Sequence, residues 1–239
     1  MRYMGSKRKL WKYISPIILK DRKLNQFYVE PFCGGCNSLS QVNGKRIAAD
    51  INIYLIEMWK SLIKEEKQIY PITKEIYNDV RNCYRCKNSR YSFSEIGWVG
   101  FMASYNGRFF DGGFSGNNVR VKNGDLRHYI DESMSDILQQ LETLKDVDFR
   151  CCSYDDLQIP EKSIIYCDPP YKDTKRYNTI DFDYDKFYNW CFEQSKLGNK
   201  VFISEYNMPE FFKEVWSMEV HCNINIEKNK RIEKLFTIK

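Results

Sequence analysis

The stretch "SIIYCDPPY" (163–171) decides the fold, because a short apolar run ends abruptly in an acid, two prolines and a tyrosine. The run has the length and composition of a buried strand. Proline fixes its own φ and biases the preceding residue toward extended backbone, so Pro169 and Pro170 make the end of this strand rigid. We therefore expect the Asp168 carboxylate and the Pro169 carbonyl to point in a fixed direction at one edge of a sheet.

Further strands and helices alternate on both sides of this stretch, which is typical of a parallel sheet covered by helices. Asn52 is expected to cap a helix in which Leu55, Trp59 and Leu62 share one face. The last two strands are joined by a basic turn and should form an antiparallel hairpin at the sheet edge. The predicted strands are 25–32, 45–50, 147–154, 163–168, 200–206, 217–224 and 233–239, and two further helices are predicted at 184–196 and 209–216.

The middle of the chain has a different character. It has few β-branched apolar runs, and it contains a loop dense in Gly, Asn and aromatic residues, "SYNGRFFDGGFSGNNVRVKNGD" (104–125). A helix is predicted over 131–145, with one apolar side formed by Ile137, Leu138, Leu141 and Leu144. We interpret residues 65–146 as an inserted, mainly helical lobe, and residues 1–64 and 147–239 as the main domain.

Composition narrows the class of protein. With 239 residues, 43% of them apolar, the chain can bury a sizeable core. No apolar run is long enough to span a membrane, and the N-terminus is too polar for a secretory signal. The odd count of nine cysteines fits a reducing compartment better than a set of disulfides. An intracellular, cytoplasmic protein is therefore expected. Basic residues cluster in 1–23, 81–90 and the C-terminal tail, as on a polyanion-binding surface or a solvated face.

Two other strand ends carry polar chemistry besides Asp168. "PFCGG" (31–35) follows the first strand, and its glycines allow a tight turn close to a ligand. Asp50 ends the second strand, where an acid commonly accepts hydrogen bonds from ribose hydroxyls. Ligands bind at the carboxyl ends of strands in an open parallel sheet, so a bound nucleoside is expected there. A glycine turn alone would indicate only a turn.

The residues after the rigid strand end suit the amino edge of a nucleobase. The Asp168 carboxylate and the Pro169 carbonyl are both acceptors, and an amino group offers two N–H donors. Tyr171 supplies a flat face for stacking on a planar ring. The alternative interpretation is a rigid turn with an exposed acid, which a lone "DPP" would favour.

Five motifs occur along the chain in the order "RYMGSKRKL" (2–10), "VEPFCGGCNS" (29–38), "AADIN" (48–52), "YCDPPY" (166–171) and "NKRIEKLFTI" (229–238). Together they resemble the Dam-type (D12 class) adenine-N6 DNA methyltransferases, which use S-adenosyl-L-methionine. The loop "YNGRFFDGGFSG" (105–116) is similar to the Asn/Arg-Gly-Phe loop of that family's target-recognition domain. The resemblance implies a Rossmann-like methyltransferase sheet, with residues 65–146 as the DNA-binding lobe.

The resemblance also implies a mechanism. A target adenine stacked in duplex DNA must be flipped out before it can be methylated. Asp168 and the Pro169 carbonyl would hold its N6 amino group, Pro170 would keep the turn rigid and Tyr171 would stack on the base. Methyl transfer is then a direct in-line displacement that relies on positioning. His128 and His221 lie outside the motifs and are not needed.

The residues implied for cofactor binding come from the motifs, with one addition. Tyr154 could pack near the cofactor's adenine or could equally belong to the core. Cys36 stands where the family's glycine motif usually has another Gly, and its side chain could crowd the methionine moiety. The candidates are Tyr3, Lys7, Phe32, Gly34, Asp50, Tyr154 and Asp168.

The inserted lobe supplies the candidates for DNA contact. Each of them is individually better explained as a phosphate contact or a solvated charge than as a reader of bases. The candidates are Arg81, Lys87, Asn106, Arg108, Arg120 and Lys122.

Several alternatives stay open. Cytosine-N4 methylation also presents an amino group to such acceptors, RNA substrates are less favoured, and a non-catalytic DNA-binding module could retain the fold. "CGGC" (33–36) and "CYRC" (83–86) could together bind zinc, but their separation exceeds the usual ribbon spacing, so no metal is expected. A monomer is expected, although the sequence does not define the oligomeric state, the DNA target sequence or a partner restriction nuclease.

Overall fold

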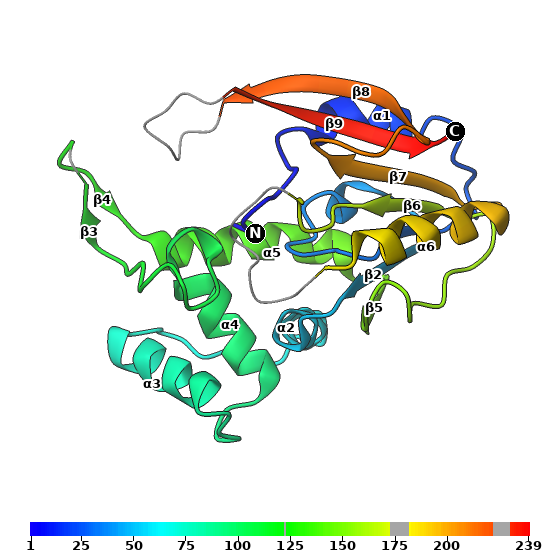
Figure 1. Ribbon diagram of the computed structural model, residues 1–239. Helices are drawn as coiled ribbons and strands as arrows, with labels where there is room; N and C mark the ends of the chain where they lie inside the picture. Colours follow the sequence, from blue (N-terminus) through cyan, green and yellow to red (C-terminus); the bar gives the residue numbers. More distant parts are fainter. Residues whose placement is uncertain (122, 173–181, 222–229) are drawn as a thin grey trace.

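A seven-stranded sheet forms the centre of the structure, a computed structural model that describes residues 1–121, 123–172, 182–221 and 230–239 (Figure 1). The strand order is β5-β2-β1-β6-β7-β9-β8. The five strands from β5 to β7 are parallel, whereas β9 pairs antiparallel with both β7 and β8. The strands are β1 Tyr28–Glu30, β2 Arg46–Asp50, β5 Val147–Cys151, β6 Ile164–Cys167, β7 Lys200–Glu205, β8 Phe212–His221 and β9 Lys230–Ile238.

The predicted Rossmann-like sheet with a closing antiparallel hairpin is thus confirmed, but one predicted helix is wrong. The segment 209–216 was expected to form a short helix. Instead, β8 begins at Phe212, which pairs with Ile238 across the hairpin. Phe212 is 4% exposed, so pairing with β9 and burial of that ring override the local pattern.

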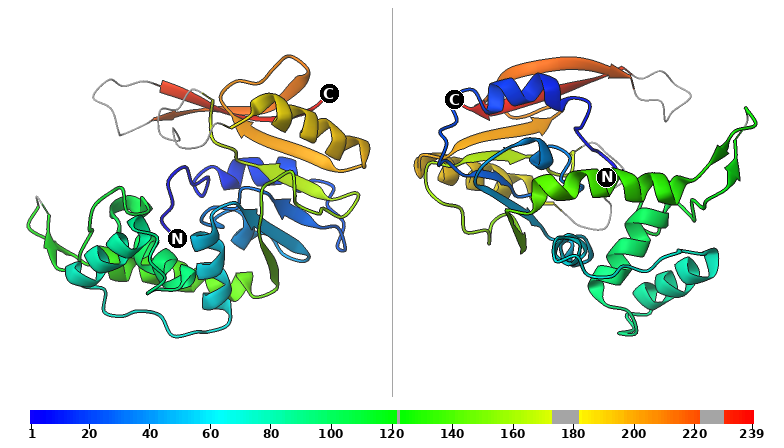
Figure 2. Two further views of the ribbon diagram at one scale, coloured as in Figure 1. Left: turned by 60° about the horizontal axis from the view of Figure 1, so that its bottom comes forward. Right: turned by 180° about the vertical axis from the view of Figure 1, so that it is seen from behind.

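Two hydrophobic cores lie on the two faces of the sheet because successive strand residues point to opposite sides. Val29, Ile165 and Ile203 join one core, together with helix α6 (Tyr184–Lys196). Tyr28 and Tyr166 join the other, which includes α1 (Trp11–Ile18), α2 (Ile53–Ile63) and α5 (Tyr129–Leu144). The helices therefore cover both faces of the sheet (Figure 2).

The predicted Asn52 cap of α2 is confirmed, and it fixes where that helix starts after β2. The Asn52 Oδ1 accepts hydrogen bonds from the backbone N–H groups of Tyr54 (3.1 Å) and Leu55 (3.3 Å). These bonds satisfy two donors that the first turn of a helix otherwise leaves free. The cap lies two residues after Asp50, so it also fixes the loop that carries this acid.

Residues 65–146 are mainly helical, and they pack directly on α2. This segment contains α3 (Lys74–Arg85), α4 (Phe93–Ala103), α5, the 3-10 turn η2 (Tyr105–Gly107) and a small hairpin of β3 (Val119–Arg120) and β4 (Leu126–Arg127), which projects away from the sheet (Figure 1). Helix α4 crosses α2 closely at Gly97, where an added Cβ would lie 2.1 Å from the Tyr54 carbonyl oxygen. The side chains of this segment join the same core as α1 and α2.

The apolar side predicted for α5 is only partly buried. Ile137 and Leu144 are fully buried, but Leu138 is 58% exposed and Leu141 is half-buried. The helix turns by about 100° per residue, so Leu138 points away from the face that Ile137 presents to the core.

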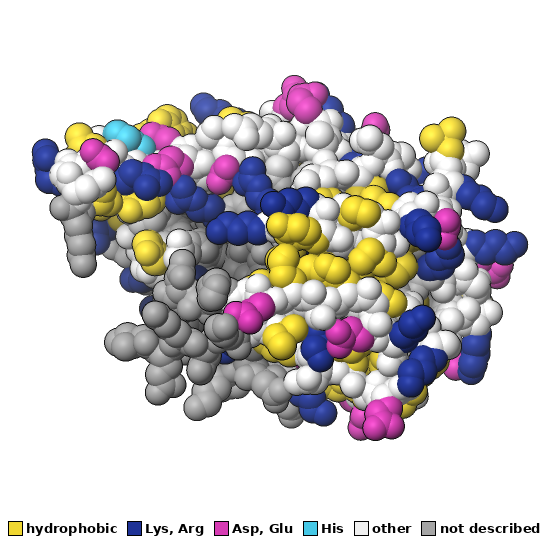
Figure 3. Space-filling view, turned by 90° about the horizontal axis from the view of Figure 1, so that it is seen from above, with side chains coloured by type: hydrophobic (Ala, Val, Ile, Leu, Met, Phe, Trp, Pro, Cys, Tyr) yellow, Lys and Arg dark blue, Asp and Glu magenta, His cyan; other side chains and the backbone are white. Residues whose placement is uncertain are grey.

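The upper face of the molecule, formed by β8, β9 and α1, has apolar side chains in its middle with Lys and Arg around them (Figure 3). Exposed apolar residues of these elements include Tyr13 at 44% and Ile232 at 50%. Tyr13 stacks on Trp216, with ring centroids 6.5 Å apart. Within the described residues, no helix has the length and apolar character that crossing a bilayer requires.

Candidate functional site

Four neighbouring parallel strands end in or next to an acidic residue at the same edge of the sheet. In spatial order, β2 ends at Asp50, β1 at Glu30, β6 just before Asp168 and β7 at Glu205. Parallel strands place their carboxyl ends together, so the predicted pair, Asp50 and Asp168, share one edge with Glu30 between them. The topology therefore brings the glycine turn, the second acid and the "DPPY" corner to one side of the molecule.

Asp168 forms an ion pair with Lys7 from the N-terminal segment. The Lys7 Nζ lies 2.9 Å from Asp168 Oδ1 and 3.2 Å from Oδ2, and it also donates to the Gly5 carbonyl at 3.2 Å. The Lys7 side chain is 7% exposed and that of Asp168 is 23% exposed. Burial raises the pKa of Asp168, and the Lys7 ammonium opposes that rise.

The charge on Lys7 is stabilised by the same cluster. Burial lowers the pKa of Lys7, but the Asp168 and Glu233 carboxylates outweigh burial, so the pKa of Lys7 is raised overall. Lys7 was predicted to bind the cofactor, and the structure shows that it also contacts the acid assigned to catalysis. The N-terminal segment and the corner after β6 therefore form one site.

Tyr171 is held on several sides. Its hydroxyl donates to Glu233 Oε2 on β9 at 2.8 Å, and the Tyr206 ring packs perpendicular to it at 4.6 Å between centroids. The Lys7 Nζ lies 4.6 Å from the centroid of the Tyr171 ring, so an ammonium group covers one face of the ring that we expected to stack on a base. Before Tyr171, the Pro170 carbonyl accepts a hydrogen bond from the Tyr184 hydroxyl at 2.8 Å, and Pro169 is buried.

The glycine turn after β1 is tied to Asp50. The Gly34 N–H donates to Asp50 Oδ2 at 3.1 Å, and the Asn52 N–H donates to Oδ1 at 3.0 Å. Burial raises the pKa of Asp50, and these backbone N–H groups oppose the rise. Gly34 has φ +45°, and an added Cβ would lie 2.6 Å from the Tyr3 ring, so Tyr3 packs directly against this turn.

Cys36 ends this turn in an unusual backbone conformation. Its φ is +51°, a region that favours glycine, yet its side chain is fully buried. The thiol lies 3.8 Å from the Gly34 carbonyl oxygen, which it can reach as a donor. The chain therefore follows a glycine-like path here, and the Cys36 side chain belongs to the core.

Two of the predicted cofactor residues meet in an aromatic group beside the turn. The rings of Phe32 and Tyr154 are 5.5 Å apart, and both contact Phe182 and Phe187. Tyr154 is 8% exposed, whereas Phe32 is half-buried. Burial, helped by Asp155, raises the pKa of Tyr154 to about 12. Tyr154 thus belongs to the core and also lies next to Phe32 at the strand edge.

Sequence reasoning missed three acids of this site, Glu30, Glu205 and Glu233. Glu30 and Glu205 end strands just as Asp50 does, so the same signal could have identified them. Glu233 lies within β9, and it reaches Tyr171 only because the antiparallel strand returns beside β7. Nothing in the local sequence around Glu233 indicates that contact.

The lobe residues predicted to contact DNA fall into separate places. Asn106 and Arg108 lie at η2, which packs on the N-terminal segment: an added Cβ at Gly107 would be 2.3 Å from the Arg2 carbonyl oxygen. Arg81 is on α3, where it donates to Asn78 at 3.1 Å and lies 5.5 Å from the Tyr77 ring centroid, and Lys87 is exposed just after α3. Arg120 is exposed on the β3–β4 hairpin, and Lys122 lies outside the described residues.

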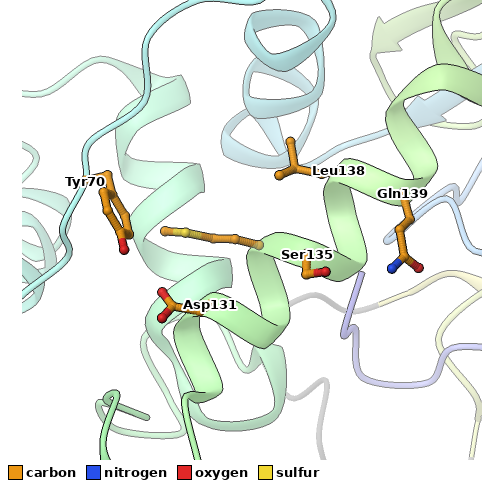
Figure 4. Close-up of a pocket in the computed structure, with 6 residues that line it drawn as sticks. Tyr70, Asp131, Ser135, Leu138 and Gln139 are labelled. Carbon is orange, nitrogen blue, oxygen red and sulfur yellow. The ribbon is translucent and has the colours of Figure 1, made fainter.

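A pocket of about 650 Å³ lies elsewhere, between the segment around Tyr70 and helix α5 (Figure 4). Figure 4 shows Tyr70 on one side and Asp131, Ser135, Leu138 and Gln139 along the helix. None of the residues predicted for cofactor or catalysis lines it. The strand-edge site, rather than this pocket, therefore gathers the predicted chemistry.

The two C-x-x-C pairs differ in how deeply their cysteines are buried. Cys33 and Cys36 are buried in the glycine turn, whereas in the second pair Cys83 is buried and Cys86 is exposed. In the part of the chain that the structure describes, no group of three or more His, Cys, Asp or Glu side chains is placed to hold a metal ion.

Comparison with known proteins identifies the family. Residues 3–123 and 112–235 match the family model described as D12 class N6 adenine-specific DNA methyltransferase. The chain belongs to this family. The predicted resemblance is thereby confirmed, and the N-terminal, glycine, acidic, "DPPY" and closing-strand motifs all fall within the matched residues or at their border.

Individual relatives of this D12 class chain are more distant. It is 26% identical over 189 residues to the Type II methyltransferase M.FokI of Planomicrobium okeanokoites, a match that covers 72% of this chain and 28% of the relative. The chain thus spans little more than a quarter of that relative's length.

Among solved structures, the rRNA methyltransferase AviRa from Streptomyces viridochromogenes has a TM-score of 0.44 at 9% identity, with 99% of this chain and 86% of AviRa covered. The methyltransferase SMU.472 in complex with SAH has a TM-score of 0.41 at 12% identity, with 99% and 54% covered. Both scores are below 0.5, so neither structure bears on the substrate of this protein.

Proposed function

We propose that this protein is a site-specific DNA methyltransferase that transfers the methyl group of S-adenosyl-L-methionine to the N6 amino group of adenine. The observation that carries the proposal is the corner after β6, where Asp168 is fixed beside two prolines at the same strand edge as the glycine turn and Asp50. Membership of the D12 class family supports the choice of adenine.

The residues at the strand edge fit the proposed cofactor. Asp50 accepts one N–H on each carboxylate oxygen and retains further lone pairs for ribose hydroxyls. Half-buried Phe32, which packs on Tyr154, offers a ring surface for an adenine, and the lack of side chains on Gly34 and Gly35 lets Tyr3 pack directly against the turn. When bound, S-adenosyl-L-methionine would supply an electrophilic methyl group.

This chain's own residues would position the amino group. The Asp168 carboxylate and the Pro169 carbonyl accept its two N–H donors, and the prolines hold those acceptors in a fixed direction. In the structure, the Lys7 ammonium forms an ion pair with the Asp168 carboxylate and lies over the Tyr171 ring. Entry of a flipped base therefore requires the Lys7 Nζ to move off Asp168 and Tyr171.

Duplex DNA is the proposed macromolecular partner, with residues 65–146 as the recognition lobe. The η2 turn supports this role best, because it places Asn106 and Arg108 on the N-terminal segment that also carries Tyr3 and Lys7. Arg81 and Lys87 are farther along the lobe, on and after α3, and are suited to phosphate contacts.

Replacing Asp168 with Ala is expected to abolish methyl transfer to DNA while calorimetry still detects S-adenosyl-L-methionine binding. Asp148→Ala is the matched control, since Asp148 is an exposed acid on β5 with 52% of its side chain accessible. Near-wild-type turnover of the Asp168 variant would show that the assigned chemistry is wrong. Mass spectrometry of the modified nucleosides distinguishes N6-methyladenine from N4-methylcytosine, and failure of the wild-type protein to bind cofactor would favour a non-catalytic DNA-binding module.

A further inference from the structure

Glu205 is a buried acid beside the "DPPY" corner that the proposed reaction does not use. It ends β7 and is 3% exposed. Strands β6 and β7 are parallel neighbours in which Cys167 is opposite Ile203. Two residues beyond that pair, the chain reaches Pro169 on one strand and Glu205 on the other, so this acid lies next to the corner.

The contact between Glu205 and the corner is direct. Glu205 Oε1 accepts the backbone N–H of Lys172, the residue after "DPPY", at 2.9 Å. Oε2 has no hydrogen-bond partner among the residues that the structure describes. One residue earlier, the Tyr171 hydroxyl donates to Glu233 at 2.8 Å. Two carboxyl groups from β7 and β9 therefore hold the two residues that follow the prolines.

We propose that Glu205 is a positioning residue for methyl transfer: by holding the backbone at Lys172, it fixes the direction in which Asp168 and the Pro169 carbonyl present their acceptors. This inference rests on the proposed function. Proline restricts only its own φ and the residue before it, so the chain after Pro170 needs a separate anchor. The Lys172 N–H, two residues after Pro170, has such an anchor in the Glu205 carboxylate.

The surroundings of Glu205 bring the pKa of its carboxyl group close to neutral pH, so its protonated and ionised forms are both populated there. Burial raises the pKa of Glu205 to about 7; the N–H groups of Lys172 and Tyr206 oppose the rise, and the Asp168 and Glu233 charges add to it. A carboxylate accepts a stronger hydrogen bond than a neutral carboxylic acid does. The anchor at Lys172 should therefore tighten as pH rises through about 7.

The basic side chains near Glu205 contact other partners. Lys234 is opposite Glu205 in the β7–β9 register, but its Nζ lies 3.1 Å from Glu214 on β8. Arg231 on β9 donates to the Tyr206 hydroxyl at 3.3 Å. On the α6 side, the neighbouring titratable group is the phenol of Tyr188, whose pKa burial raises, with a further rise from Glu205. Among the described residues, no ion pair neutralises Glu205.

The test compares Glu205→Gln and Glu205→Ala with the control Glu193→Gln, an exposed acid on α6 that pairs with Lys196. The amide oxygen of Gln still accepts the Lys172 N–H but never ionises, so the ratio of wild-type kcat to Glu205→Gln kcat should rise from about 1 at pH 6 to about 5 at pH 8. Glu205→Ala should lower kcat about 10-fold or more at every pH, because the corner loses its anchor. The Glu193→Gln ratio should stay constant across this range.

Hydrogen exchange at the Lys172 amide provides a readout that does not depend on activity. Glu205→Ala should speed this exchange about 10-fold, whereas Glu205→Gln should leave it near the wild-type rate. Wild-type exchange at Lys172 in the Ala variant, or a pH-independent kcat ratio for the Gln variant, would overturn the proposal. A wild-type protein that transfers no methyl group would overturn the proposed function, and the exchange would still decide whether Glu205 anchors Lys172. Should the Ala variant not fold, the Gln variant alone decides.

Discussion

Replacing Lys7 with Met is expected to destabilise the protein by leaving the Asp168 carboxylate without its counter-charge. The Lys7 Nζ lies 2.9 Å from Asp168 Oδ1, and the Lys7 side chain is 7% exposed. Removing one partner of a buried ion pair costs about 3–5 kcal/mol. Because Asp168 keeps 23% exposure, and water can therefore solvate part of its charge, we expect the low end, about 3 kcal/mol at pH 8.

The pH dependence gives the sign of this effect. Burial raises the pKa of Asp168, and Lys7 opposes the rise, so the Met variant should raise that pKa further. An acid whose pKa is higher in the folded state favours folding below its unfolded pKa, and that stability is lost as pH rises toward the folded pKa. The penalty of the Met variant should therefore be smaller at pH 5 than at pH 8. The raised pKa of Lys7 makes its own contribution constant over this range, since it is lost only near pH 10 and above.

Urea unfolding of four proteins measures the interaction: wild type, Lys7→Met, Asp168→Asn and the double variant. The double variant should be more stable than the sum of the single penalties predicts, by about 2 kcal/mol, because neither charge is then left unpaired. Additive penalties, or a Lys7→Met penalty that is the same at pH 5 and pH 8, would refute the idea that this pair is electrostatically coupled in the folded protein.

Two further predictions follow from close contacts. Gly97→Ala should lower the free energy of unfolding by about 3 kcal/mol, because the new Cβ would lie 2.1 Å from the Tyr54 carbonyl oxygen. Urea unfolding measures this loss, with Ser135→Ala at an exposed position of α5 as the control. If the two variants were equally stable, the observed α4–α2 packing would be contradicted. Asp50→Ala should weaken S-adenosyl-L-methionine binding about 10-fold or more in calorimetry, because it removes the acceptor that fixes Gly34 and the proposed ribose contact; binding equal to that of Asp148→Ala would argue against this role.

The parallel part of the sheet was predictable from the sequence because its strands are short, apolar and bounded by clear breaks. Asp50 and Asp168 could be placed at one edge from the chain order alone, since parallel strands align their carboxyl ends. The helix prediction for 209–216 was wrong because the adjacent Phe211 and Phe212 fit both a helical and a strand pattern. Only pairing with the partner strand decides between the two. Phe212 is buried against β9 in the hairpin, a contact that lies 26 residues along the chain at Ile238.

Contacts made across the sheet edge were not predictable. Lys7 was assigned to the cofactor from its motif, but its pairing with Asp168 depends on how the N-terminal segment crosses the corner after β6. Glu233 reaches Tyr171 for a similar reason, through an antiparallel strand whose register the sequence does not specify. Glu205 was accessible to the strand-end rule and was overlooked because no motif surrounds it.

The tight crossing of α4 over α2 limits how such a chain could be re-engineered. At Gly97 the backbones of α4 and α2 leave no space for a Cβ atom. Beside them, the rings of Tyr54, Tyr84 and Phe109 pack against one another. A chimera that received residues 65–146 from a relative would bring a foreign helix surface against the host's α2, so the graft would need the matching outer face of α2 as well. Under the recognition role proposed for residues 65–146, changes at the β3–β4 hairpin, which extends away from the sheet, would disturb this packing less (Figure 1).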